Sequence, residues 1–346
     1  MKKCMIWLVA AIMMILAGCS GNSGGSESSS GSGSGDSGKS DETKTMKMAV
    51  ATSKDRSLTQ GLYKFQEIVE AETNGSIKVE VFPDGQLGGD RVVFEGLKMN
   101  SIQGTTMSTG PIAGFVKEFE VLDFPYLFKD EETAYKVLDG QIGTDLLTKL
   151  DSQGIVGLNY WENGFRQLTN NKREVKSVED VKGLKIRTLE NELHIDLWKS
   201  LGANPSPMPY TELFTGLEQG VVDGQENPAG NITTGNFYEV QDYVTKTDHI
   251  YNASVFMISD KFMQTLSDEE KEIVTKASEE ARDYQRELNQ KESEEAFAAL
   301  EKEGMKVTEL SEEARKDFED KAKEIYSKYT EKVGKELVDQ IMNEIK

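Results

Sequence analysis

The apolar positions of this chain switch repeatedly between the two-residue period of strands and the longer period of helices. Strands are predicted at residues 47–52, 77–82, 102–107, 155–160, 184–187, 243–247, 250–258 and 305–310. Helices are predicted at residues 58–73, 90–99, 131–150, 193–201 and 211–219, with more from residue 311 onward. Repeated strand–helix–strand units predict an α/β fold in which helices cover a mainly parallel sheet. Because the alternation restarts after Arg166, we expect two α/β domains.

The longest helical pattern runs from Ser267 to about Glu303. Ser267 and Glu270 have the spacing of a capping box, and neither Gly nor Pro follows until Gly304. Such a helix spans about 55 Å at 1.5 Å per residue. Its two ends have apolar faces, whereas residues 289–295 are polar all round. This pattern predicts a strut across both domains, and a coiled-coil segment is the alternative.

The first 44 residues have the composition of an export signal and a linker. Lys2 and Lys3 precede an apolar stretch at residues 5–16, which is too short to span a bilayer permanently. The ending Leu16-Ala17-Gly18-Cys19 resembles a bacterial lipobox, which implies cleavage after residue 18 and lipid on Cys19. An ordinary signal peptide with a chance cysteine is the alternative. Residues 19–44 are rich in Ser and Gly and predict a flexible tether with a reach of roughly 30 Å.

These features predict a protein outside the cytoplasm, periplasmic or on the cell surface, that touches the membrane only through its lipid anchor. The mature chain then keeps a single cysteine, which carries the lipid, so no disulfide is expected. Its net charge is −20, or −22 once Lys2 and Lys3 are removed. Such acidity argues against nucleic acid as a partner, and any capture of an anion has to be local.

Enzyme chemistry is not expected. The only histidines, His194 and His249, lack the spacing of metal ligands, and no nucleophile elbow, Walker motif or dinucleotide motif is present. His194 falls within a predicted helix, where we interpret it as a surface or packing residue. We therefore predict no catalytic residue, no cofactor and no metal. A secreted enzyme and a purely structural surface lipoprotein remain alternatives.

Two arginines favour a binding protein. Arg166 follows a strand through Asn163-Gly164, a turn dipeptide that could mark a crossing between lobes. Arg187 ends the strand 184–187, and open α/β sheets bind ligands at the carboxyl ends of their strands. A guanidinium offers a planar fork of donors that matches a carboxylate. Taken alone, each arginine is more readily interpreted as a surface ion pair, and Asn227-Pro228 as a loop turn.

Six motifs in order make the chain resemble a known family. They are Gln86-Leu87-Gly88-Gly89-Asp90-Arg91, Phe124-Pro125-Tyr126, Asn163-Gly164-Phe165-Arg166-Gln167, Lys182-Gly183-Leu184-Lys185-Ile186-Arg187, Gly202-Ala203-Asn204-Pro205-Ser206-Pro207-Met208 and Asp223-Gly224-Gln225-Glu226-Asn227-Pro228. From Met46 onward the chain closely resembles the extracytoplasmic solute receptors of TRAP transporters, the C4-dicarboxylate/sialate or DctP type.

The resemblance implies a two-lobe periplasmic-binding-protein fold with a long helix across both lobes. Lobe 1 would comprise residues 45–163 plus about 253–290, and lobe 2 residues 164–252 plus about 291–346. The lobes would close on a small organic acid, a dicarboxylate or a sugar acid, which a monomeric receptor delivers to the permease subunits in the membrane. A receptor that feeds a sensor kinase is the alternative.

The resemblance also implies roles for particular residues. Arg187 matches the arginine that pairs with the substrate carboxylate, and Arg166 matches a second, supporting arginine. Asn227 matches an asparagine that hydrogen-bonds the ligand, and Tyr210 matches an aromatic wall of the pocket. Asp90 lies where some members contact polar groups of their ligand.

Two further observations bear on the ligand. Glu190, just past Arg187, could accept a hydrogen bond from a ligand hydroxyl or shield the arginine. Members that bind sialate carry an acidic residue in the strand after Ile102, where this chain has uncharged residues at 106–109. This departure weakens the case for sialate.

Overall fold

A computed structural model describes residues 43–346, so the predicted signal peptide, Cys19 and most of the tether lie outside the described residues. The strands are β1 (Lys44–Ala49), β2 (Ile77–Phe82), β3 (Gly104–Ser108), β4 (Ile155–Asn170), β5 (Lys185–Thr188), β6 (Asn204–Pro207), β7 (Gly224–Pro228), β8 (Tyr243–Lys246), β9 (Tyr251–Ser259) and β10 (Lys306–Glu309). The α-helices are α1 (Ser57–Glu72), α2 (Asp90–Met99), α3 (Thr109–Ile112), α4 (Glu131–Leu138), α5 (Gln141–Leu147), α6 (Val178–Val181), α7 (Glu192–Ser200), α8 (Tyr210–Glu218), α9 (Ala229–Thr234), α10 (Asp260–Met263), α11 (Asp268–Lys302), α12 (Glu312–Lys323), α13 (Tyr326–Val333) and α14 (Lys335–Glu344). Three 3-10 helices join them: η1 (Lys117–Asp123), η2 (Thr148–Gln153) and η3 (Phe237–Glu239). Within residues 43–346, no helix combines the length and the apolar character needed to cross a membrane.

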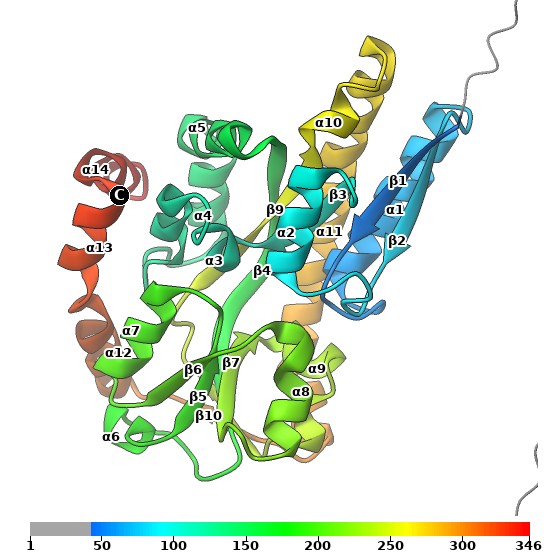
Figure 1. Cartoon of the computed structure of the whole chain (residues 1–346). Coiled ribbons are helices and arrows are strands. Elements are labelled where there is room, and N and C mark those ends of the chain that lie inside the picture. Colours follow the sequence, from blue (N-terminus) through cyan, green and yellow to red (C-terminus); the bar gives the residue numbers. More distant parts are fainter. Residues whose placement is uncertain (1–42) are drawn as a thin grey trace, which may run out of the picture. The chain divides into compact units, whose positions relative to one another are not determined.

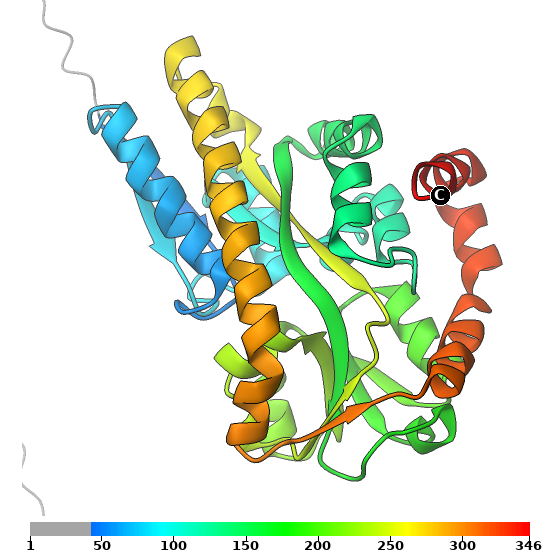
Figure 2. The ribbon, with the colours of Figure 1, turned by 180° about the vertical axis from the view of Figure 1, so that it is seen from behind.

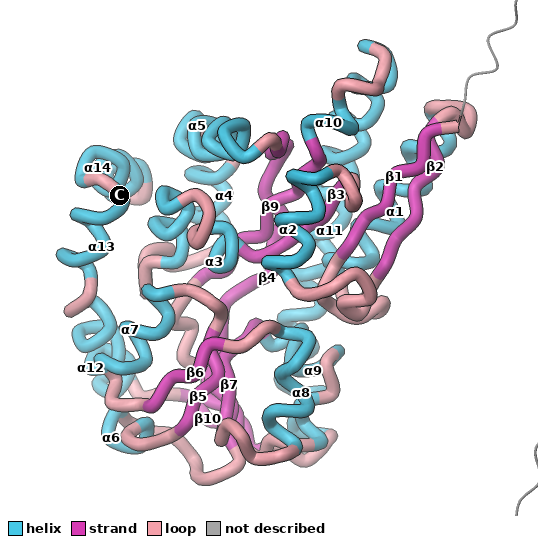
Figure 3. Tube along the Cα trace, in the orientation of Figure 1, coloured by secondary structure: helices cyan, strands magenta, loops and turns pink. Residues whose placement is uncertain are grey.

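Strand pairing builds two sheets that share one long strand (Figure 1, Figure 3). The first sheet has the order β2-β1-β3-β9-β4, and we call it with its helices lobe 1. The second continues from β4 through β7 and β5 to β6, with β8 and β10 beside β4, and we call it with its helices lobe 2. β1, β2 and β3 pair in parallel, as do β5, β6 and β7, which agrees with the predicted strand–helix–strand units.

The strands that join the lobes are antiparallel, so the prediction of a mainly parallel sheet is wrong at the centre. β4 pairs with β9 up to Phe165 and then with β7 from Arg166 onward, so it crosses between the sheets where the sequence suggested a crossing. The predicted turn at Asn163-Gly164 is instead an irregularity within one continuous strand. Gly164 has a φ of +108°, a conformation that favours glycine, and this allows the strand to bend without ending.

The long helix α11 is confirmed, with both hydrogen bonds of the capping box between Ser267 and Glu270. Figure 2 shows it running past the strands of both sheets. Its first half packs on lobe 1 in a core that includes Ala277, and its second half packs on lobe 2 in a core that includes Leu300. Within the segment 289–295, which was predicted to be solvated, Gln290, Lys291, Glu294 and Glu295 are exposed and only Asn289 is buried.

Other boundaries differ at particular residues. The predicted helix 131–150 breaks at Gly140, whose extended backbone separates α4 from α5. The C-terminal helices return to lobe 1, where the hydroxyl of Tyr326 donates to the carbonyl of Pro125 and Lys136 Nζ donates to the carbonyl of Glu344 at 2.6 Å. The prediction assigned these helices to lobe 2 alone, although they also contact lobe 1. The division into lobe 1 (residues 45–163 plus about 253–290) and lobe 2 (residues 164–252 plus about 291–346) stays a prediction.

Candidate functional site

Arg187 is the second-last residue of β5, and its side chain is buried. Its Nε donates to the carbonyl of Met208 at 2.8 Å, which aims the guanidinium away from the strand. Its Nη1 is buried and has no hydrogen-bond partner among the described residues. Burial lowers the pKa of Arg187 to about 10, although the nearby carboxylates of Glu226 and Asp90 oppose this shift. A buried donor without a partner costs stability, so this nitrogen marks a place for an acceptor.

Arg166 is equally buried but has a partner for every nitrogen. Its Nε donates to Oε2 of Glu226, and its Nη2 donates to Oε1 of the same carboxylate at 3.0 Å. Its Nη1 donates to Asn252 Oδ1 at 2.9 Å, and Nη2 lies 3.4 Å from Asn227 Oδ1. A direct contact from Arg166 to a ligand stays a prediction. The geometry gives this arginine the role of holding Glu226 and Asn227 in place.

Glu226 is at the centre of this network, although in the sequence it was noted only as part of the motif Asp223-Gly224-Gln225-Glu226-Asn227-Pro228. It is buried, with His249 Nε2 at 3.1 Å and His194 Nδ1 at 3.7 Å from its oxygens. Burial alone would raise the pKa of Glu226, but Arg166 and the two histidines hold it well below its usual range. Both histidines of the chain lie beside this one carboxylate. This convergence depends on the fold, so no pattern along the sequence identified Glu226.

His194 is not a surface residue, because it is fully buried. Its Nε2 lies 3.1 Å from Oδ2 of Asp123, which belongs to η1 in lobe 1, whereas His194 belongs to α7 in lobe 2. Burial lowers the pKa of His194, but the hydrogen bond to Asp123 and the nearby carboxylate of Glu226 outweigh it, so the net shift is upward. His249 is also fully buried, and for this histidine the effect of burial exceeds that of the hydrogen bond to Glu226, so its pKa is lowered. His194 thus links Glu226 to the opposite lobe.

Asn227 and Tyr210 lie close to the arginines. Asn227 is the second-last residue of β7 and pairs with Gln167 of β4, and its side-chain oxygen accepts from Asn231 Nδ2 at 3.1 Å. Tyr210 begins α8 with its ring edge-on to Phe237 at 5.8 Å between centroids. Burial raises the pKa of Tyr210 to about 12, against the nearby charge of Arg187. Tyr210 also lines a cleft of about 490 Å³ between the loops of the two lobes.

Asp90 and Glu190 approach Arg187 from the two lobes. Asp90 is the first residue of α2. The preceding Gly89 packs closely on Pro209, because a Cβ added to Gly89 would lie only 3.3 Å from Cβ of Pro209. Pro209 follows Met208, whose carbonyl accepts the hydrogen bond from Arg187. Burial raises the pKa of Asp90 to about 6, the charge of Arg187 opposes this, and the charge of Glu190 adds to it. The structure therefore brings the predicted residues Arg187, Asp90 and Glu190 together.

Arg56 is a second centre that sequence reasoning missed. It precedes α1 in lobe 1 and is 1% exposed. Its Nε donates to Asn231 Oδ1 at 2.7 Å, Nη2 donates to the carbonyl of Asn163 at 2.6 Å, and Nη1 reaches Asn289 and Glu292 of α11. Arg56 thus ties lobe 1 to α9, β4 and α11. These partners are 107 to 236 residues away in the sequence, so no local pattern could identify them.

Side-chain hydrogen bonds from several elements join the lobes. Arg56 meets Asn231, His194 meets Asp123, and Asn191 Nδ2 donates to the carbonyl of Gly110 at 3.0 Å. Each contact joins an element of lobe 1 to an element of lobe 2. The two lobes are therefore closed on each other around Arg187.

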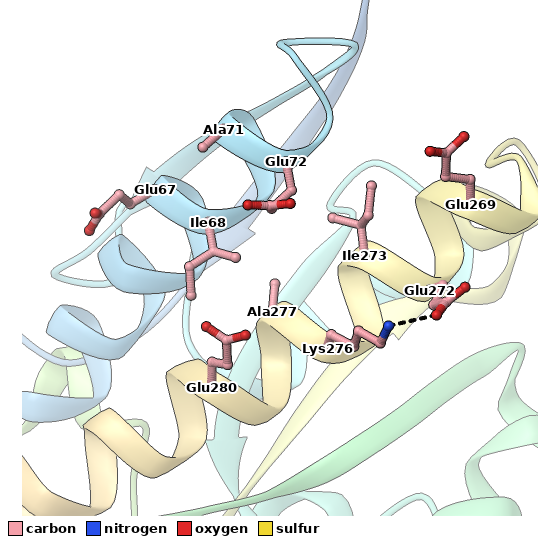
Figure 4. A pocket seen from close by; sticks show the side chains of 10 residues that line it. All are labelled: Glu67, Ile68, Ala71, Glu72, Glu269, Glu272, Ile273, Lys276, Ala277 and Glu280. Atoms are coloured by element: carbon pink, nitrogen blue, oxygen red, sulfur yellow. Dashed lines mark hydrogen bonds and ion pairs between the residues drawn. The ribbon is translucent and has the colours of Figure 1, made fainter.

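A separate groove lies between α1 and α11 (Figure 4). It has a volume of about 520 Å³ and is lined by five glutamates, namely Glu67, Glu72, Glu269, Glu272 and Glu280. Its only lining cation, Lys276, pairs with Glu272 at 2.6 Å. So much negative charge disfavours an anion, which separates this groove from the arginine site. Within residues 43–346, no cluster of His, Cys, Asp or Glu has the makings of a metal site.

Comparison with known proteins shows one family. The family described as bacterial extracellular solute-binding protein, family 7, matches residues 48–332. The C4-dicarboxylate-binding periplasmic protein DctP of Rhodobacter capsulatus is 33% identical over 301 residues, which cover 86% of this chain and 90% of that protein.

Solved structures agree with this result. The sugar acid binding protein DctPAm of Advenella mimigardefordensis, in complex with galactonate, is 39% identical with a TM-score of 0.86, over 88% of this chain and 98% of that one. A TRAP periplasmic solute binding protein of Polaromonas sp. JS666, bound to D-erythronate, is 36% identical with a TM-score of 0.84, over 86% of this chain and 98% of that one.

Proposed function

The chain belongs to family 7 of the bacterial extracellular solute-binding proteins, the solute receptors of TRAP transporters, and we propose that it holds a small organic acid between its lobes with Arg187 as the carboxylate clamp. The receptor then delivers the acid, as a monomer, to the permease subunits in the membrane. A sensor kinase as the partner is not favoured, because the matched proteins are transport receptors.

The buried Nη1 of Arg187 is the observation that carries this proposal. Arg56 and Arg166 have partners on all their nitrogens, so they are positioned as supports. Asn227, held by Arg166, completes the polar side of the site, and Tyr210 walls it. Exclusion of water by the closed lobes strengthens a pair between a guanidinium and a carboxylate.

A ligand screen tests the proposal. We expect a thermal-shift panel of dicarboxylates, uronates, aldonates, sialate and keto acids to contain acids that raise the melting temperature, because a ligand at 100 times its Kd adds about 2.7 kcal/mol. Uncharged sugars of the same size serve as controls. Mass spectrometry of the recovered acid separates a receptor from an enzyme, since a receptor returns it unchanged. If no acid stabilises the protein, the proposal fails.

We further propose that Cys19 carries the lipid that anchors the chain outside the cytoplasm. Cys19→Ser is expected to move the protein from the membrane fraction to the soluble fraction, because one thiol attaches the whole anchor. Fractionation and intact-mass measurement check this. Cys4→Ser is the matched control, since Cys4 lies within the predicted signal peptide and leaves with it. Retention of the Cys19→Ser protein in the membrane would contradict the proposal.

A further inference from the structure

The arginines at the site differ in how much positive charge they leave for a ligand. Arg166 faces its own carboxylate in Glu226, and both groups are fully buried. Arg56 faces its own carboxylate in Glu292. Arg187 has no carboxylate within hydrogen-bonding distance among the described residues, and its Nη1 has no partner. The site therefore offers one unpaired guanidinium fork, which matches one carboxylate.

Two carboxylates lie in the neighbourhood of this fork: the charge of Asp90 acts on Arg187, and the charge of Glu190 acts on Asp90. Asp90 comes from the first turn of α2 in lobe 1, beside the loop whose Met208 carbonyl binds Arg187. Glu190 follows β5 in lobe 2, next to Asn191, which donates to Gly110 across the lobes. Neither carboxylate has an ion-pair partner within 4 Å in residues 43–346. Both are half-buried, so their charges are only partly screened by water.

From this arrangement we propose that the site prefers a hydroxylated monocarboxylate, an acid of the aldonate type, over a dicarboxylate. The proposal rests on the proposed function. Arg187 takes the carboxylate of the ligand, and Asp90 and Glu190 accept hydrogen bonds from its hydroxyl groups. Hydroxyl donors to ionised carboxylates make strong hydrogen bonds.

A second carboxylate on the ligand would meet like charge instead. This second carboxylate would lie near Asp90 and Glu190. Arg56 and Arg166 could not neutralise it, because every nitrogen of these two arginines is already hydrogen-bonded within the protein. A site built to bind hydroxyl donors also rejects analogues that lack them, because its own polar groups then stay unpaired. Both effects disfavour succinate-like acids more than sugar acids.

Matched pairs of acids test this preference by isothermal titration calorimetry. Galactonate and galactarate differ only at carbon 6, which is a hydroxymethyl group in one and a carboxylate in the other, and erythronate and meso-tartrate differ likewise at carbon 4. We expect the monoacid of at least one pair to bind at least tenfold more tightly than its diacid. Equal or tighter binding of the diacid in both pairs overturns the proposal.

Two variants test whether the carboxylates of Asp90 and Glu190 cause the preference for the monoacid. Asp90→Asn and Glu190→Gln remove one negative charge each with little change in shape, and we expect each to reduce the ratio between monoacid and diacid affinity several-fold. Glu212→Gln, an exposed glutamate of α8, is the control and keeps the wild-type ratio. Circular dichroism of the ligand-free variants checks folding. If neither variant changes the ratio, the assigned carboxylates do not set the preference and the proposal is wrong.

The outcomes separate this proposal from the function on which it rests. If none of the four acids binds while another acid of the screening panel does, this proposal alone is overturned. If no acid of any kind binds, the proposed function is overturned as well.

Discussion

Replacing Arg187 with lysine is expected to weaken binding of the organic acid at least tenfold, which corresponds to about 1.4 kcal/mol or more. The Nε of Arg187 is already committed to the Met208 carbonyl, and this bond orients the remaining two nitrogens as a fork. A lysine ammonium is a point charge, so it cannot keep the Met208 bond and grip both oxygens of a carboxylate. Arg187→Ala is expected to lose roughly a hundredfold or more, because the charge is lost too.

Calorimetry with an acid from the screen measures both variants, and unfolding in denaturant checks that each is folded. Arg173→Lys is the matched control, since Arg173 lies on the surface of the same lobe and donates to the carbonyls of Asp180 and Lys182. We expect Arg173→Lys to bind as the wild type does. If Arg187→Lys binds the acid with wild-type affinity, Arg187 is not the residue that binds the ligand carboxylate.

Glu226→Gln is expected to destabilise the fold by about 3–5 kcal/mol, a large part of the stability of an ordinary domain. Glu226 and Arg166 are both fully buried, so loss of the carboxylate charge leaves a buried guanidinium without its counter-charge. The two histidines lose the same partner. Urea unfolding at pH 7.5 measures the difference in free energy of unfolding between wild type and variant.

The pH dependence of this difference has a definite sign. The folded protein holds the pKa of Glu226 well below 4.5, its ordinary value. The stability from its ionised form is therefore present above about pH 4.5 and is lost as the pH falls through the folded pKa. Asp90 and Glu162, whose pKa values burial raises to about 6 and about 7, are present in both proteins and cancel in the difference.

We therefore expect the gap between wild type and Glu226→Gln to shrink below about pH 4.5. Between pH 8 and 6 the gap widens on acidification, because Glu226 helps to raise the pKa of His194 and the variant lacks that contribution. Glu309→Gln is the control, because its partner Lys246 binds it on an exposed edge, and it should change stability little. A gap that widens below pH 4.5, or a Glu226→Gln protein as stable as Glu309→Gln, would contradict the role given to Glu226.

Local patterns predicted most elements of this fold. The capping box at Ser267 and the period of the apolar residues located α11 to within a residue or two. Prediction failed where distant contacts decide the outcome. A residue pair such as Asn163-Gly164 has the composition of a turn, but pairing with β9 on one side and β7 on the other keeps the chain extended there.

The candidate site divides in the same way. Family motifs pointed to Arg187, Arg166, Asn227, Tyr210 and Asp90, and Glu190 was singled out because it lies just past Arg187. The structure brings Asp90 near Arg187 and Glu190 near Asp90. Motifs treated both arginines as ligand contacts, since they cannot show which nitrogens are already bonded. The contacts of Arg56, Asp123 and His194 across the lobes were not predicted, because their partners come from other elements of the chain.

By itself, the sequence determined the alternation of strands and helices, the long helix and the family. These properties depend on neighbours along the chain, where side-chain period, caps and motifs act over a few residues. Only the tertiary structure decided that Arg166 is neutralised by Glu226 while Arg187 keeps a free donor beside Asp90 and Glu190. Whether a charge is available to a ligand depends on which groups the fold buries against it, and those groups come from residues far apart in the chain.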